Sequence, residues 1–387
     1  MKIPIAKTNL TKQEFNNIQK PLKSGWLVQG KYVKKFEQKF SAFSGVKHSI
    51  AVTSCTSALH LSLSALGFKL NDEAIVPAFT WISSANVVEH LGGKVVFCDI
   101  DLKTFNIDIN KIESLITPKT KAIIPVHLFG LPSNMDEIMI LAKKYKLWVV
   151  EDAACGFGAK FSSKHVGSFG NTGCFSFHPR KIITTGEGGM ITTNDSDLAI
   201  KLRSMRDHGA EVTDYDRHTS PKPYLLPDFP YAGYNYRMTD IQAVLGSTQL
   251  SRANHIINER KELASEFNKR MLEFSQFQIP FTNRKYDHAY QSYPCLFKSK
   301  KISIQALPKI NKQRNQLMQN LESLGISTRP ATHAVHMLQY YKNKYKIKPE
   351  DFPNSYIANQ ISISLPLYNG MSIDEIDYII KGIKKNL

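Results

Sequence analysis

Between about residue 48 and residue 200, short apolar and β-branched runs alternate with segments of helical periodicity. The run HSIAVTS (48–54) precedes the helical pattern TSALHLSLSALG (56–67), and EAIVPAF (73–79) precedes ISSANVVEHLG (82–92). Further strand-like runs lie at 93–100, 121–128, 147–154 and 173–178, and MDEIMILAKKYK (135–146) is a helix pattern between two of them. This alternation predicts an α/β fold, with a mostly parallel sheet covered by helices on both faces.

The chain continues beyond this region into a second, smaller unit. Residues 239–270 have the pattern of one long helix, which we expect to connect the two units. A strand pattern (289–297) and two helix patterns (310–325 and 372–385) follow it. A length of 387 residues suits two domains. We therefore predict a large domain over residues 1–250 and a smaller α+β domain over residues 251–387.

One long segment has no clear periodicity. Residues 209–235 are rich in Pro, Tyr and Asp. A loop of that length in a compact protein is usually functional or bound to a partner. We therefore expect this segment to take part in a site or an interface.

Composition excludes several classes of protein. The five cysteines are scattered and form no CxxC pair, so neither a disulfide framework, a zinc site nor another metal site is expected. No stretch approaches the roughly 18 apolar residues of a membrane helix. We expect a cytoplasmic protein with no membrane partner. The net charge of +17 comes from lysines that are not gathered with aromatic residues, so we also expect no nucleic-acid partner.

The stretch GCFSFHPRKIITTGEGGM concentrates reactive groups after a predicted strand. Ser176 ends the strand, and Lys181 follows a proline-containing turn. The glycines of GEGG allow a backbone to approach a ligand closely. Upstream, Asp152 ends the strand pattern LWVVED. A carboxylate there can hold the ring nitrogen of pyridoxal phosphate in its protonated form, which that cofactor requires.

Two further strand ends complete this set. Thr56 and Ser57 open a helix pattern directly after a strand, where backbone N–H groups form a phosphate site. Trp81 follows the strand pattern EAIVPA and can stack on a flat ring. Each signal is weak alone. The order of phosphate turn, aromatic residue, carboxylate and lysine along one α/β unit predicts a pyridoxal 5′-phosphate site, with Lys181 bound to the cofactor as a Schiff base.

Over nearly its whole length the sequence resembles the sugar aminotransferases of the DegT/DnrJ/EryC1/StrS family, which have the fold type I pyridoxal-phosphate architecture. Matching segments include SGWLVQGKYVKKFEQKF, VPAFTWISSANVVEHLGGKVVFCDID, VVEDAACGFGA, GYNYRMTDIQAVLGSTQL and ISLPLYNGMSIDEID. The block FSFHPRKIITTGEGG is the most specific of them.

The resemblance implies a role for each matching residue. Lys181 would be the catalytic residue and Asp152 would bind the pyridine nitrogen. Trp81 and Ala154 would lie on the two faces of the ring. The phosphate would be held by Thr56, Ser57 and Ser176, and by Asn235 of a neighbouring subunit with support from Arg237. The active site would then be shared across a homodimer. Substrate contacts would come from Trp26, Arg329, His333 and His336.

Three positions depart from the family pattern. Cys155 stands where the family usually has Gln or His near the ring hydroxyl of the cofactor, and a thiol is a weaker hydrogen-bond partner. Ser54-Cys55 stands where a glycine is common in the phosphate turn. Arg180 stands beside the lysine in place of a small or polar residue.

The predicted reaction moves an amino group from an amino acid, by resemblance glutamate, to a nucleotide-linked keto sugar, in amino-sugar biosynthesis for surface polysaccharide or glycoconjugate such as the O-antigen of lipopolysaccharide. We also expect partial burial to lower the pKa of Lys181, because only a neutral amine attacks. A sugar dehydratase of the same family, in which His replaces this lysine, a keto-cyclitol aminotransferase and a non-catalytic cofactor-binding regulator are the alternatives. The nucleotide, the sugar and the 3- or 4-keto position stay open.

Overall fold

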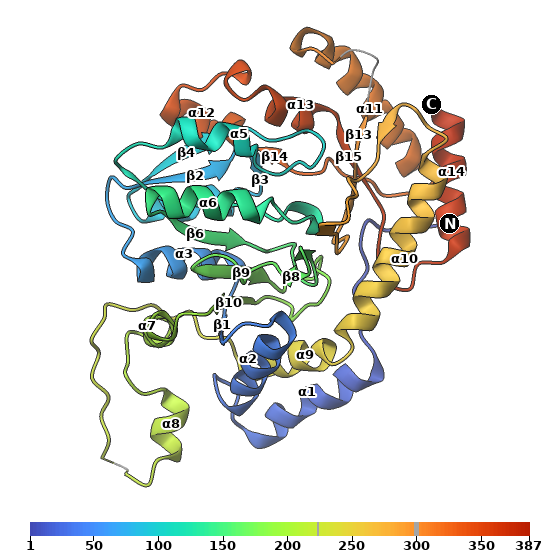
Figure 1. The fold of residues 1–387 in the computed structure, drawn as a ribbon. Coiled ribbons are helices and arrows are strands. Elements are labelled where there is room, and N and C mark those ends of the chain that lie inside the picture. The colour runs from blue at the N-terminus through green and yellow to red at the C-terminus, as the bar shows by residue number, and fades with distance from the viewer. Residues whose placement is uncertain (223, 298–301) are drawn as a thin grey trace.

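The computed structural model describes residues 1–222, 224–297 and 302–387. Its centre is a seven-stranded sheet in the order β1-β10-β9-β6-β5-β2-β4 (Figure 1). All neighbouring pairs from β9 to β4 are parallel, and only β10 runs against its neighbours. The predicted mostly parallel α/β sheet is confirmed. The strands are β1 (His48–Val52), β2 (Glu73–Pro77), β4 (Lys94–Cys98), β5 (Thr120–Ile123), β6 (Trp148–Asp152), β9 (Thr172–Ser176) and β10 (Gly189–Thr193).

Helices cover both faces of this sheet, as the strand sequences require. In β6, Val150 packs with residues of α3, α4 and α7, whereas Val149 packs with α6 on the opposite face. Successive side chains of a strand alternate between faces, so a strand buried on both sides is mostly apolar. The large-domain helices are α1 (Lys12–Ser24), α2 (Lys31–Ser44), α3 (Cys55–Leu66), α4 (Ser83–His90), α5 (Ile109–Ile112), α6 (Met135–Tyr145), α7 (Ser196–Arg206), α8 (Asp214–Thr219) and α9 (Asp240–Leu250).

The C-terminal part forms a separate layer beside the large sheet, around the antiparallel order β11-β13-β15 (Figure 1). Its elements are α10 (Ala253–Met271), β11 (Phe277–Gln278), β13 (Tyr293–Phe297), α11 (Leu307–Ser323), α12 (Gln339–Tyr345), α13 (Pro353–Ile361), β15 (Ser362–Leu365) and α14 (Ile373–Asn386). The start of the chain joins this layer, because the backbone N–H of Ile3 donates to Gly325 and its side chain lies in the same core. The boundary at residue 250 stays a prediction.

Two small sheets of short strands complete the described fold. One sheet has the order β12-β7-β8, and a second pairs β14 with β3. The second pair joins the C-terminal part to the large sheet, because His333 lies opposite Thr80 in its register. Their bounds are β3 (Phe79–Thr80), β7 (Lys160–Phe161), β8 (Lys164–His165), β12 (Tyr286–Asp287) and β14 (His333–Ala334).

Two segments differ from the sequence prediction. The stretch 239–270 is two helices, α9 and α10, and the backbone leaves the helical region at Arg252 (φ −117°, ψ 17°). The side chain of Arg252 donates to Glu14 Oε1 (3.0 Å) and to the carbonyl of Asn9 (2.6 Å), which anchors the break. The expected loop 209–235 contains the short helix α8.

No helix among the described residues is long and apolar enough to cross a membrane. In the same parts of the chain, no group of three or more His, Cys, Asp or Glu side chains is placed to hold a metal ion.

The turn that precedes β9 depends on one buried carboxylate. Glu151 is fully buried and accepts hydrogen bonds from the backbone N–H groups of Gly167 (2.6 Å), Phe169 (2.8 Å) and Gly170 (2.7 Å). His127 Nε2 lies 3.0 Å from the same carboxylate. Burial raises the pKa of Glu151, but the hydrogen bonds from His127 and the backbone outweigh it, so the pKa lies below its ordinary value.

We predict that Glu151→Gln lowers the free energy of unfolding at pH 7 by about 1–3 kcal/mol, because three backbone donors lose a charged acceptor. The wild-type stabilisation is present above the ordinary pKa of 4.5 and is lost as the pH falls below it, since the folded-state pKa is depressed. The difference between variant and wild type, measured by urea unfolding, should therefore shrink at acid pH. An exposed control, Glu322→Gln, should show neither effect, and an equal difference at both pH values would contradict the assignment.

Candidate active site

The carboxylate at the end of β6 is the most buried charged group among the predicted site residues. Asp152 is only 4% exposed. Its Oδ2 accepts a hydrogen bond from Ser84 Oγ at 2.6 Å, and its Oδ1 accepts one from the backbone N–H of Ala154 at 3.1 Å. Sequence reasoning missed Ser84, which lies in the first turn of α4. In the sequence, Ser84 is only a serine three residues after Trp81, and serine is common at the start of any helix.

Lys181 lies in a turn after β9 and its side chain is half-buried. The turn closes through a hydrogen bond from the backbone N–H of Lys181 to the carbonyl of His178. Its Nζ donates to Cys155 Sγ at 3.2 Å. Cys155, one of the positions that depart from the family pattern, is thus in direct contact with the lysine amine.

The charge state of Lys181 differs from the sequence prediction. Burial lowers the pKa of Lys181, as expected, but the sulfur of Cys155 and the carboxylate of Asp152 raise it, and the net direction is upward. Without a cofactor, the amine is therefore held in its charged form, and a group that binds Lys181 has to displace its proton.

The start of α3 presents hydroxyl groups beside the backbone N–H groups of a helix N-terminus. Ser54 caps the helix by accepting from the backbone N–H of Ser57 at 3.0 Å, and Thr56 Oγ1 donates to Ser83 Oγ at 3.1 Å. A Cβ at Gly189 would lie 2.4 Å from the carbonyl carbon of Ser54, so only glycine lets β10 approach this turn. Ser176, at the end of β9, is half-buried and accepts weakly from the backbone N–H of His178 (3.4 Å).

Trp81 and His333 form an open surface beside these groups. The side chain of Trp81 is 60% exposed, and its ring centroid lies 5.6 Å from that of His333. The pairing of β14 with β3 brings the two residues together. Ala154 is half-buried, so both residues predicted to flank the cofactor ring keep accessible surface.

Asn235 and Arg237 share one partner in this subunit. Asn235 is exposed and forms a backbone bridge with Asp207. Arg237 donates to Asp207 Oδ1 at 2.5 Å. Asp207, which sequence reasoning missed, therefore holds both residues in place.

The four predicted substrate contacts lie in different places. Trp26 packs against Tyr215 and His218 of α8, at ring distances of 5.4 and 5.6 Å. Arg329 is exposed and lines a small cavity. His333 lies beside Trp81, as described above. His336 is fully buried against Phe97 and Phe352, so its side chain has no surface for a substrate, and the structure gives no support to that contact.

The side chains present fit pyridoxal phosphate. An amine, a buried carboxylate and a helix start with hydroxyl groups are the chemistry that the cofactor needs for its aldehyde, ring nitrogen and phosphate. The glycine at position 189 keeps the phosphate turn free of side-chain bulk from β10. The fold and this set of side chains define the class of fold type I pyridoxal-phosphate enzymes.

Comparison with known proteins agrees with this class. Residues 8–384 match the DegT/DnrJ/EryC1/StrS aminotransferase family, and the chain belongs to that family. It is 36% identical to the spore coat polysaccharide biosynthesis protein SpsC of Bacillus subtilis, over 99% of this chain and 96% of that protein. It is 35% identical to GDP-perosamine synthase of Caulobacter vibrioides, over 100% and 98% of the two chains.

A solved structure agrees as well. The PLP form of Spr1654 from Streptococcus pneumoniae superposes with a TM-score of 0.90 and 27% identity, and each chain covers 100% of the other. The protein is therefore a pyridoxal-phosphate-dependent aminotransferase, and the predicted family, fold and cofactor are confirmed.

We predict that Cys155→Ala lowers the pKa of Lys181 in the cofactor-free protein, because the variant removes the sulfur that holds the charged amine. At a fixed pH below that pKa, an amine-directed reagent should then label Lys181 faster, as measured by peptide mass spectrometry. The matched control Cys295→Ala removes a buried thiol from the C-terminal core and should leave the labelling rate unchanged. Equal labelling of Cys155→Ala and wild type would refute this role of Cys155.

Proposed function

We propose that this enzyme transfers an amino group from glutamate to the keto group of a nucleotide-linked sugar, in the biosynthesis of a surface polysaccharide or glycoconjugate. The observation that carries the proposal is the contact of Lys181 Nζ with Cys155, under the electrostatic influence of Asp152. Ser84 hydrogen-bonds both to Asp152 and to the carbonyl of the exposed Trp81. The names of GDP-perosamine synthase and of the spore coat polysaccharide protein SpsC support the substrate class.

Pyridoxal phosphate supplies, when bound, a ring that accepts the electron pair left by a broken C–H bond. Asp152 provides a fixed negative charge for the ring nitrogen, and Ser84 keeps one carboxylate oxygen oriented through its 2.6 Å hydrogen bond. Thr56, Ser57 and Ser176 bind the phosphate with hydroxyl and backbone donors at the start of α3 and the end of β9. Trp81 and Ala154 cover the two faces of the ring.

Lys181 has two tasks. Its Nζ would hold the cofactor covalently and would be released when an incoming amine takes its place. The freed Nζ then takes the proton from the α-carbon of the amino donor, and in the second half of the reaction it returns a proton to the carbon that receives the amino group. Both tasks need the side chain at the edge of the open surface rather than in the core, which agrees with its partial burial.

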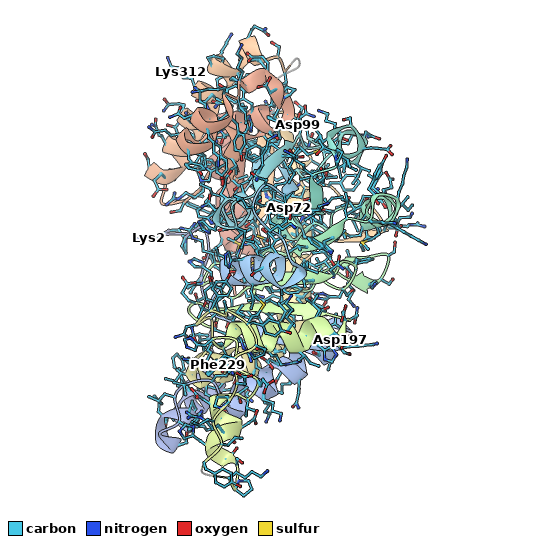
Figure 2. All side chains as sticks on the ribbon, turned by 90° about the vertical axis from the view of Figure 1, so that its left-hand side faces the viewer. Lys2, Asp72, Asp99, Asp197, Phe229 and Lys312 are labelled. Atoms are coloured by element: carbon cyan, nitrogen blue, oxygen red, sulfur yellow. The ribbon has the colours of Figure 1, made fainter. Side chains whose placement is uncertain are left out.

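We also propose that the active enzyme is a homodimer with shared sites. The segment 209–235 extends away from the body of the molecule with α8 (Figure 1). Figure 2 shows Phe229 on this segment, in the half of the molecule away from Lys312 of the C-terminal part. Four large apolar side chains of the segment are exposed, at Tyr224, Leu226, Phe229 and Tyr231. An exposed apolar group of this kind is typical of a protein interface, and Asn235 follows it directly.

We predict that Lys181→Ala folds and binds pyridoxal phosphate without a covalent bond, and that its rate of amino transfer falls by roughly 10²- to 10⁴-fold or more, the contribution of a positioned acid–base group. The formation of 2-oxoglutarate from glutamate, with a panel of nucleotide-linked keto sugars, measures transfer, and the absorbance of the lysine-bound cofactor measures the bond. The exposed control Lys309→Ala should retain both. Full activity in Lys181→Ala would exclude the assignment.

We predict that Asn235→Ala lowers transfer about tenfold or more, since it removes a phosphate contact, and that mixing it with Lys181→Ala restores activity. In a mixed dimer with shared sites, one site has both defects and the other has none, so an equal mixture should recover about one quarter of wild-type activity. Mass measurement of the intact dimers checks that subunits have exchanged. Exchange without recovery would show that each site is complete within one subunit.

A further inference from the structure

A cysteine and a lysine of the candidate site lie in direct contact. Lys181 Nζ donates to Cys155 Sγ at 3.2 Å. The two residues lie in different turns, one directly after β6 and one after β9. Backbone hydrogen bonds close both turns, from Gly156 to Ala153 (2.8 Å) and from Lys181 to His178 (2.8 Å). The fold therefore holds a thiol and an amine together, although the proposed reaction uses only the amine.

Cys155 is also the most accessible of the thiols. All five cysteines belong to the described residues, and four of them are buried, whereas Cys155 is half-buried. A small oxidant can therefore reach its sulfur. By contrast, Cys55 Sγ donates to the carbonyl of Cys174 at 3.4 Å, and burial raises the pKa of both of these thiols. Only a thiolate attacks an oxidant, so Cys55 and Cys174 stay inert.

The charge on the amine favours reaction at this sulfur. Burial lowers the pKa of Lys181, but Cys155 and Asp152 raise it, and the net direction is upward, so the amine carries its proton. A cation beside a thiol stabilises the thiolate, which is the reactive form. Once a thiolate is oxidised to a sulfenic acid, a neighbouring nitrogen can condense with it to form a sulfenamide. Lys181 is therefore both an activating charge and a nucleophile already in contact with Cys155.

We propose that Cys155 is a redox modification site, at which a peroxide joins its sulfur to Lys181 Nζ as a reversible sulfenamide. An amine in that bond cannot hold pyridoxal phosphate, so the bond switches the enzyme off. The proposal goes beyond the proposed transfer reaction, because it concerns the state in which the lysine is not bound to the cofactor. When the cofactor occupies Lys181, the same amine is protected from the sulfur.

The reaction balances with one molecule of peroxide. In the first step the thiolate of Cys155 attacks a peroxide oxygen, so that an S–O bond forms and the O–O bond breaks. The leaving hydroxide takes a proton from the Lys181 ammonium and becomes water, and the two electrons lost by sulfur reduce the peroxide. In the second step the neutral amine attacks the sulfur, so that an S–N bond forms and the S–O bond breaks. The second hydroxide takes a proton from the nitrogen and leaves as water.

Peptide mass spectrometry tests the bond in the full-length protein. After hydrogen peroxide treatment of the cofactor-free wild type, the peptides that contain Cys155 and Lys181 should be joined, with a combined mass lower by two hydrogen atoms. Dithiothreitol should separate them, because its thiolate attacks the sulfur and releases the amine. Cys155→Ser and Lys181→Ala should each lose the joined product. In Lys181→Ala, dimedone should instead trap the sulfenic acid on Cys155.

A second measurement uses the cofactor. Wild type loaded with pyridoxal phosphate before the peroxide treatment should lose the joined product, because the amine of Lys181 is occupied. Wild type treated first should fail to develop the absorbance of the lysine-bound cofactor, and dithiothreitol should restore it. Two matched controls should still form the bond: Cys295→Ala removes a thiol of the C-terminal core, and Cys55→Ala removes a buried thiol whose charge would act on Lys181.

A joined pair of peptides that contain Cys155 and Cys55 would overturn the proposal, because the sulfur would then have formed a disulfide. Oxidation of Cys155 in wild type without a bond to Lys181 would overturn it too, as would a joined product that retains a peroxide oxygen. Equal yields with and without bound cofactor would contradict the protection of the amine. Wild type that forms the bond but produces no 2-oxoglutarate with any acceptor would support this proposal and count against the proposed function alone.

Discussion

The carboxylate of Asp152 is buried at the end of β6, the central strand of the large sheet, and the arrangement of the site depends on it. A carboxylate that is 4% exposed is costly to bury unless hydrogen bonds replace its hydration. The chain provides them from Ser84 in α4 and from the backbone N–H of Ala154. The Ser84 donor is in place only because α4 packs on the face of the sheet toward which Asp152 points, whereas the Ala154 donor comes from the turn that follows β6 directly. The carboxylate therefore ties the start of α4, and with it Trp81, to the end of β6.

Adjacent acidic residues on β6 have opposite structural consequences because a strand alternates its faces. Glu151 points to the face opposite Asp152, and its carboxylate oxygens accept hydrogen bonds from three backbone N–H groups and from His127. These hydrogen bonds fix the turn that leads into β9. Asp152 faces the helices that carry the hydroxyl groups. Glu151 thus fixes the start of β9 and, through it, the position of Lys181. Asp152 faces the side of the sheet on which the cofactor would bind.

The sequence predicts the strand ends well because hydrophobic periodicity is a local property. Asp152, Thr56 and Trp81 all follow apolar runs, and parallel strands place such ends together. The sequence does not predict contacts between distant segments, which depend on packing. Ser84, Asp207 and the break at Arg252 each become meaningful only through a partner far along the chain. His336 is an example of the opposite kind, a predicted substrate contact that packing removes. Its side chain lies in the core between Phe97 and Phe352.

The single amine of Lys181 also gives a physical reason for the order of the proposed reaction. Both proposed substrates have to reach that amine, whose Nζ contacts Cys155. The proposed donor is a small amino acid and the proposed acceptor is a large nucleotide-linked sugar. The reacting carbons of the two substrates nevertheless have to occupy one position beside Lys181. Donor and acceptor therefore exclude each other, and the keto acid has to leave before the sugar enters, which is the condition for ping-pong kinetics.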